Sequence, residues 1–214
     1  MKTYTSFQEL DALGEGLAKR YTGNTHRWNS SCFDIEGFIT DFLKLPILYE
    51  AFAEDDPSKI GFLSDGITPL IVYRAGKKTP IVFPKDTIVI ESFLQRSDES
   101  GRRRFTLAHE AAHFILNRHV PMQTACFHNE YDHEFHYSGE ELAKMFSLNE
   151  TLANRLGAAV LMPPFLVGRA LKKYNNGQPI VYYTEGIFAP DTKIRLQSMS
   201  DALGVSYSAL INRL

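Results

Sequence analysis

Arg102-Arg-Arg-Phe-Thr-Leu-Ala-His-Glu-Ala-Ala-His-Phe-Ile-Leu-Asn-Arg-His119 is the stretch of sequence that decides the fold. It contains no Pro and no Gly, so it predicts one uninterrupted helix. Apolar residues recur at helical spacing on more than one side, which indicates a helix that is buried on several flanks. Residues four apart lie on the same face of a helix, so His109 and His113 can present two imidazoles to one point.

The pentapeptide His109-Glu-Ala-Ala-His113 has the H-E-x-x-H spacing of zinc peptidases. In that chemistry, two neutral imidazoles hold the metal, and the glutamate takes a proton from a water on the ion without being a ligand. His109 and His113 are therefore candidate metal ligands, and Glu110 is the candidate catalytic base. The competing interpretation is a coincidental match in a core helix, where buried His and Glu side chains would be costly unless other groups satisfied them.

A zinc site of this kind needs a third protein ligand and an open fourth position. The best candidate is Glu150, near the start of a second predicted helix that Pro163-Pro164 ends. An alternative stays open at this point, because Ser147-Leu-Asn-Glu150 also fits a capping box. In that arrangement Glu150 would only close the N-terminus of its helix.

Small residues on the two predicted helices favour a close approach between them. Ala153 and Gly157 lie on the same face as Glu150, and Ala108 and Ala112 lie beside the two histidines. A close approach of these faces would bring the carboxylate of Glu150 near both imidazoles.

The rest of the chain predicts an α+β fold. A capping box, Ser6-Phe-Gln-Glu9, opens one helix, and a second helix is expected from Asp34 to just before Pro46. Short runs rich in β-branched and aromatic residues then predict a small, mostly antiparallel sheet packed on the H-E-x-x-H helix. The expected strands are 47–53, 60–63, 70–73, 81–83 and 87–91. A hydrophilic connection, 95–101, is expected to join the sheet to the helix.

The C-terminal part predicts a helix at 165–174, a strand at 179–184 and a helix-turn-helix outline. In that outline, a helix at 194–203 is followed by Gly204 and a helix opened by Val205-Ser206 that runs to Leu214. The pair lacks a basic stripe, which favours packing or substrate docking over direct DNA binding. Its basic residues are Lys193, Arg195 and Arg213.

Composition sets broad limits on function. The chain has 214 residues, 44% of them hydrophobic and 22% charged, as expected for a globular protein. A net charge of −2 argues against a protein that coats nucleic acid. The sequence shows no apolar leader, no membrane-spanning run and only two cysteines, so a cytoplasmic protein without membrane contact is expected. The predicted organisation is a helical extension, 1–30, followed by one domain, 31–214.

Two blocks, Arg104-Phe-Thr-Leu-Ala-His-Glu-Ala-Ala-His113 and Glu150-Thr-Leu-Ala-Asn-Arg-Leu-Gly-Ala-Ala-Val-Leu-Met-Pro163, resemble the signatures of the ImmA/IrrE family of metallopeptidases. The family pattern is roughly R-F-T-x-A-H-E-x-x-H, then E-x-x-A-N-x-F-A-A-x-L-L-M-P. The resemblance covers most of the chain from about Asp34. The departures are Ala112 for Gly, Leu156 for Phe, Gly157 for Ala and Val160 for Leu.

This resemblance implies a zincin-like fold with Glu150 as the third ligand of Zn²⁺, or of Mn²⁺. It also implies a regulatory protease that cuts a helix-turn-helix repressor and so relieves repression in a mobile element or a stress response. The alternative is a binding protein that keeps the metallopeptidase fold and holds a repressor or DNA without cleavage. The intact Glu110 favours the protease, because a pure binder needs no proton acceptor there.

The segment between the two blocks, 117–149, is rich in His and Tyr. Side chains from it could stabilise a developing oxyanion. The candidates are Tyr131, His133, His136 and Tyr137. A second metal site is an alternative interpretation, but the spacing matches no closed zinc pattern, so a loop is the simpler one. The residues concerned are His119, Cys126, His128, Asp132, His133, Glu134 and His136.

Overall fold

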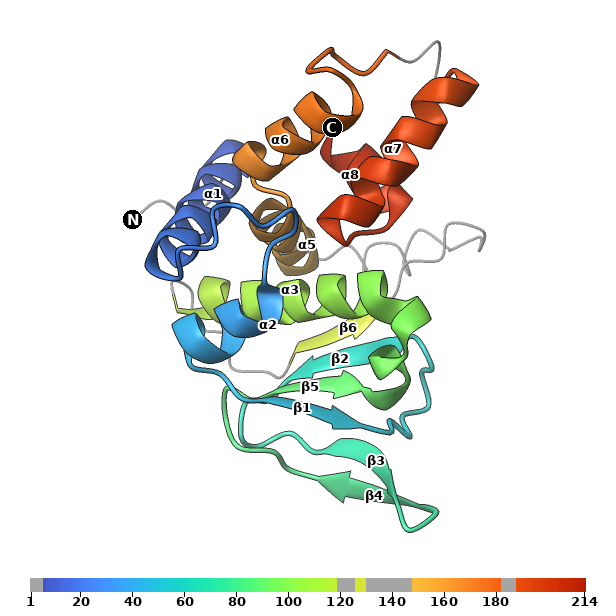
Figure 1. Cartoon of the computed structure of the whole chain (residues 1–214). Coiled ribbons are helices and arrows are strands. Elements are labelled where there is room, and N and C mark those ends of the chain that lie inside the picture. The colour runs from blue at the N-terminus through green and yellow to red at the C-terminus, as the bar shows by residue number, and fades with distance from the viewer. Residues whose placement is uncertain (1–5, 119–125, 130–147, 182–187) are drawn as a thin grey trace. The chain divides into compact units, whose positions relative to one another are not determined.

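The computed structural model describes residues 6–118, 126–129, 148–181 and 188–214, with 126–129 and residue 148 described by their backbone alone. The chain divides into two compact units: Met1–Asp34 with Ala158–Leu214, and Ile35–Gly157. Both α-helices and β-strands are present, which confirms the predicted α+β class (Figure 1). The division of the sequence at residue 30 stays a prediction.

The unit Ile35–Gly157 contains a four-stranded sheet and a separate hairpin (Figure 1). The strand order of the sheet is β1-β5-β2-β6, with β1–β5 parallel and the other two pairings antiparallel. The prediction of a mostly antiparallel sheet is therefore confirmed. The strands of the sheet are β1 (Ile47–Glu50), β2 (Lys59–Leu63), β5 (Ile88–Glu91) and β6 (Cys126–Asn129), and those of the hairpin are β3 (Leu70–Arg74) and β4 (Lys77–Ile81).

The sheet lies between the metal-motif helix, α3 (Ser100–Asn117), and the β3–β4 hairpin (Figure 1). Side chains alternate between the two faces of a strand, and β2 shows this directly. Gly61 faces Thr106 and Glu110 of α3, whereas Phe62 packs into an apolar cluster on the opposite face. The other members of that cluster are Leu70, Val72, Phe83 and Val89. One face of β2 thus packs against α3, and its other face contributes to the apolar cluster.

The hairpin corrects one predicted strand. Ala75 and Gly76 both have positive φ, 49° and 76°, as a two-residue type I′ turn requires, and Arg74 pairs directly with Lys77. The chain therefore turns back at once and β4 begins at Lys77, so the predicted strand at 81–83 was placed too late. β4 pairs only with β3 among the described residues, and its Lys-rich, Pro-containing sequence suits an edge strand.

The connection between the sheet and α3 lies earlier in the chain than the predicted range 95–101, because α3 already begins at Ser100. Two 3₁₀ turns, Ser92–Gln95 and Ser97–Glu99, lead into α3 at Ser100. The charged side chains pair locally, with Arg102 contacting Glu99 at 3.0 Å, so the polar composition reflects short turns rather than an open loop.

The helix predicted after Asp34 is present, but most of it is π-helical. One turn of α2 (Ile35–Gly37) leads into a π-helix, Phe38–Leu43, that ends at Lys44 in the left-handed conformation, φ 62°. The rings of Phe38 and Phe42 stack with centroids 5.3 Å apart. A π-helix has more residues per turn than an α-helix, so its side chains do not follow the 3.6-residue period on which the prediction rested.

The other unit is helical. Its helices are α1 (Phe7–Asn24), the end of α5 (Leu148–Leu161), α6 (Pro164–Tyr174), α7 (Pro190–Leu203) and α8 (Tyr207–Arg213). The predicted capping box of α1 is confirmed, because Ser6 Oγ accepts from Glu9 N at 3.2 Å and Glu9 Oε2 accepts from Ser6 N at 2.9 Å. Gly14 of α1 packs so closely on α5 that an added Cβ would lie 2.6 Å from that of Ala159. Close packing therefore explains why a glycine stands within this helix.

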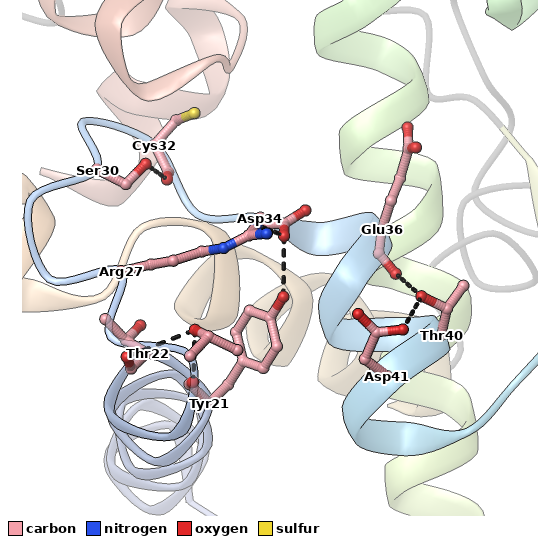
Figure 2. A network of polar contacts seen from close by, with 10 residues as sticks. Tyr21, Thr22, Arg27, Ser30, Cys32, Asp34, Glu36, Thr40 and Asp41 are labelled. Atoms are coloured by element: carbon pink, nitrogen blue, oxygen red, sulfur yellow. Dashed lines mark hydrogen bonds and ion pairs between the residues drawn. The ribbon is translucent and has the colours of Figure 1, made fainter.

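Residues 25–34 are fixed to α1 and α6 by polar contacts. The carboxylate of Asp34 accepts a hydrogen bond from Tyr21 Oη at 2.9 Å and another from Arg27 (Figure 2). Arg169 of α6 donates to the carbonyl oxygens of Ser30, at 3.1 Å, and Trp28.

The predicted helix-turn-helix outline is confirmed as local structure. α7 ends at Gly204, whose φ of 67° is the left-handed conformation that glycine adopts readily, and Ser206 caps α8. Residues 179–181 form no strand, and the rest of the predicted strand at 179–184 lies outside the described residues. None of the described helices combines the length and hydropathy of a membrane span.

Candidate metal centre

α3 places two imidazoles together in a buried position. His109 and His113, one turn apart, have relative exposures of 0% and 1%. Their Nε2 atoms are 2.9 Å apart and their ring planes are inclined at 79°. The helix is buried from Thr106 to Ile115, so packing of this turn holds both rings in place.

α5 brings a carboxylate to both rings. Glu150 Oε2 lies 3.1 Å from His109 Nε2, and Glu150 Oε1 lies 3.2 Å from His113 Nε2. One ligand atom from each of the three residues falls within 4.8 Å of the others. Glu150 is 21% exposed, so the cluster meets solvent on its side. Ser147 of the alternative capping box lies outside the described residues.

The electrostatics of the cluster favour metal-binding protonation states. Burial disfavours the charged imidazolium and lowers the pKa of His109, so the neutral ring that coordinates metals is favoured. Burial also opposes ionisation of Glu150, but its contacts with His109 and His113 outweigh this effect and lower the pKa of Glu150 to about 2. The cluster therefore combines the favoured neutral ring of His109 with an ionised carboxylate.

Close backbone packing fixes the distance between α3 and α5. A Cβ added at Gly157 would lie 3.1 Å from both the carbonyl carbon and oxygen of Ala108, and 3.2 Å from the backbone nitrogen of His109. Ala153, one turn earlier, is fully buried. The predicted approach of these small residues to the metal-motif helix is confirmed at Gly157 and Ala108.

Asn154 also contacts the cluster, and no role was predicted for it. Its Oδ1 lies 2.9 Å from His109 Nδ1, on the side of the ring opposite the Nε2 atom that faces Glu150. Asn154 follows Glu150 by four residues, so both lie on one face of α5. That spacing was a usable signal, because a residue one turn from a candidate ligand is well placed to contact the same site.

Glu110 is fully buried between α3 and β2. Neither carboxylate oxygen has a hydrogen-bond partner among the described residues. Burial and the nearby charge of Glu150 raise the pKa of Glu110 well above its usual value, with the backbone N–H of Leu63 the opposing influence. An added Cβ at Gly61 would lie 2.5 Å from Glu110 Oε1, so the carboxylate occupies space that only a glycine leaves. The sequence pattern gave no sign of this strand-to-helix contact.

The donor set fits a metal ion. Two imidazole nitrogens and one carboxylate, drawn from two helices, form the type of ligand set that divalent transition metals bind. The orphaned, buried carboxylate of Glu110 beside this set would be an expensive feature in a purely structural core.

Other candidates from the sequence lie outside the described residues. This applies to the oxyanion candidates Tyr131, His133, His136 and Tyr137, and to His119, Asp132 and Glu134 of the alternative second metal site. Cys126 and His128 belong to β6, which is described by its backbone alone.

Comparison with known proteins assigns the family. The family model described as the IrrE N-terminal-like domain matches residues 92–214, which include both α3 and α5. A comparison with curated proteins gives no match. The matched span covers more than half of the chain and contains His109, His113 and Glu150 on the two helices that the fold brings together. The chain belongs to the ImmA/IrrE family of metallopeptidases.

Proposed function

We propose that this chain is a zinc-dependent, site-specific protease that cleaves a helix-turn-helix repressor and so relieves repression in a mobile element or a stress response. One observation carries the catalytic part: two imidazoles and a carboxylate from separate helices converge, next to a buried glutamate that has no hydrogen-bond partner among the described residues. The repressor substrate rests on membership of the ImmA/IrrE family. The protease acts in the cytoplasm, where such repressors bind DNA.

His109, His113 and Glu150 hold the zinc ion. When bound, zinc supplies Lewis acidity at the open side of this ligand set. The same nitrogen and oxygen donors also accept Mn²⁺, although imidazole-rich sets bind zinc more tightly. Burial of both histidines excludes competing solvent from two of the three ligands.

Glu110 moves the proton in the reaction. Its carboxylate accepts a proton from water as the water oxygen attacks the scissile carbonyl carbon. It then gives that proton to the leaving amine nitrogen as the C–N bond breaks.

The α7–α8 pair docks substrate or stabilises its own unit rather than reading DNA. Arg213 donates to the carbonyl oxygen of Met162 at 3.2 Å and to Asp11 at 2.7 Å. Arg195 donates to Asn175 Oδ1 at 3.2 Å. Two of the three basic side chains of the pair thus have partners within their own unit, which argues against a phosphate-binding face.

The decisive test is co-expression with a candidate helix-turn-helix repressor. Wild type is expected to convert the repressor to two fragments, and Glu110→Gln is expected to leave it intact. Glu15→Gln, the same chemical change on the surface of α1, is the matched control and is expected to cleave like wild type. Equal survival of the repressor with wild type and Glu110→Gln would favour the non-cleaving binder instead.

Metal analysis tests the site separately. Purified wild type is expected to contain about one zinc ion per chain, whereas His113→Ala is expected to contain none after the same purification. Equal metal content in the two proteins would refute the ligand assignment, whatever the outcome of the cleavage test.

A further inference from the structure

We infer that Asn154 is a positioning residue: it fixes the tautomer and orientation of His109, so that Nε2 of this ring presents its lone pair to the metal. This inference deepens the proposed function and rests on its metal centre. In this inference, α5 supplies Glu150 and also orients His109 through Asn154.

The hydrogen-bond chemistry of the contact sets the tautomer. A neutral imidazole carries hydrogen on one ring nitrogen and a lone pair on the other. Asn154 Oδ1 can only accept, and it lies 2.9 Å from His109 Nδ1, so Nδ1 carries the hydrogen. His109 Nε2 then presents its lone pair toward Glu150 and His113, which lie 3.1 Å and 2.9 Å away.

Burial makes this contact consequential. The ring of His109 is fully buried, so a donor on Nδ1 that lost Asn154 would lose a partner where water does not replace it. The ring could then lower its energy by moving the hydrogen to Nε2, where Glu150 accepts it. That tautomer cannot coordinate a metal through Nε2, so the loss of Asn154 would weaken metal binding without removing a ligand.

The geometry of α5 couples the two functions. Glu150 and Asn154 are one turn apart on the same face, so one helix supplies a carboxylate to both Nε2 atoms and an amide to the far side of one ring. The backbone contact at Gly157, less than one turn further along α5, keeps this face against Ala108 and His109. Partners that orient a ligating histidine in this way commonly change metal affinity by roughly 10- to 100-fold.

The test measures zinc affinity by competition with a chromophoric chelator, using Asn154→Ala, Asn154→Asp and the exposed control Asn149→Ala. Asn154→Ala is expected to bind zinc about 10- to 100-fold more weakly than wild type. Asn154→Asp keeps an acceptor of the same shape and is expected to match or exceed wild type. Asn149→Ala, on the same helix, is expected to be unchanged.

A spectroscopic measurement keeps the inference falsifiable if Asn154→Ala fails to fold. Nitrogen-15 NMR of zinc-loaded wild type is expected to show His109 with hydrogen on Nδ1 and none on Nε2. Hydrogen on Nε2, or wild-type affinity in a folded Asn154→Ala protein, would overturn the assignment. A wild-type protein that binds no zinc would instead defeat the proposed metal centre itself.

Discussion

Gly61→Ala tests the contact between β2 and the candidate catalytic base. The new Cβ would lie 2.5 Å from Glu110 Oε1 and 2.7 Å from Thr106 Cγ2. Ordinary contacts are about 3.5–4 Å, so each neighbour would have to move by about 1 Å. Both neighbours are buried on α3, which leaves no open space for the movement.

Two opposing effects decide the sign of the change in stability. Replacing glycine by alanine in a strand gains about 0.5–1 kcal/mol from backbone entropy. Overpacking of a buried site costs about 1–3 kcal/mol. The net expectation is a loss of about 1–2 kcal/mol in the free energy of unfolding, measured by urea denaturation.

A double-variant cycle assigns this loss to Glu110. Truncation by Glu110→Ala removes the Glu110 atoms that the new methyl group would meet but leaves Thr106 Cγ2 in place. Gly61→Ala should therefore cost less in that background, by about 1 kcal/mol, without becoming neutral. Equal costs in the two backgrounds would show that the carboxylate does not occupy the space beside Gly61. Cleavage by the single variant Gly61→Ala should fall about 100-fold, because a displacement near 1 Å misplaces the proton acceptor.

Three further variants test other parts of the structure. Gly16→Ala, where an added Cβ meets no atom within 4 Å, should stabilise α1 by about 0.5–1 kcal/mol in the same denaturation assay; a loss of stability would contradict the open environment. Gly157→Ala should push α5 from the backbone of Ala108, lower stability by about 1–3 kcal/mol and weaken zinc binding, and unchanged zinc affinity would speak against the close contact. Glu110→Gln should raise the melting temperature of the metal-free protein by at least about 2 °C, because it removes a buried carboxylate without a described partner; a lower melting temperature would count against that environment.

The features that could be predicted from the sequence are those with a local signal. His109 and His113 share a helical face because the period of the helix requires it, and the capping box of α1 is set by Ser6 and Glu9 alone. Glu150 was identified because small residues follow it at helical spacing and because its block resembles the family signature. In each case the deciding residues lie within a few turns of one another.

The features that were missed depend on packing between distant segments. The contact of Gly61 with Glu110 joins a strand to a helix almost fifty residues later, and no local period reports it. The parallel pairing of β1 with β5 has the same origin, since sheet order is set by what each face buries. The start of β4 was predicted too late for a different reason. The strand begins directly after the Ala75-Gly76 turn, and its lysines and proline are more typical of a loop than of a strand.

The backbone contact between Gly157 and Ala108 has a consequence for how members of this family can diverge. The packing of α5 on α3 sets the spacing of the candidate ligands. The stretch of chain from Asn117 to Leu148, which connects the two helices, is therefore not needed to set that spacing. Doubling the length of such a connection costs only about 0.6 kcal/mol in closure entropy. Insertions and deletions on either side of β6 would therefore leave the geometry of the candidate ligands unchanged.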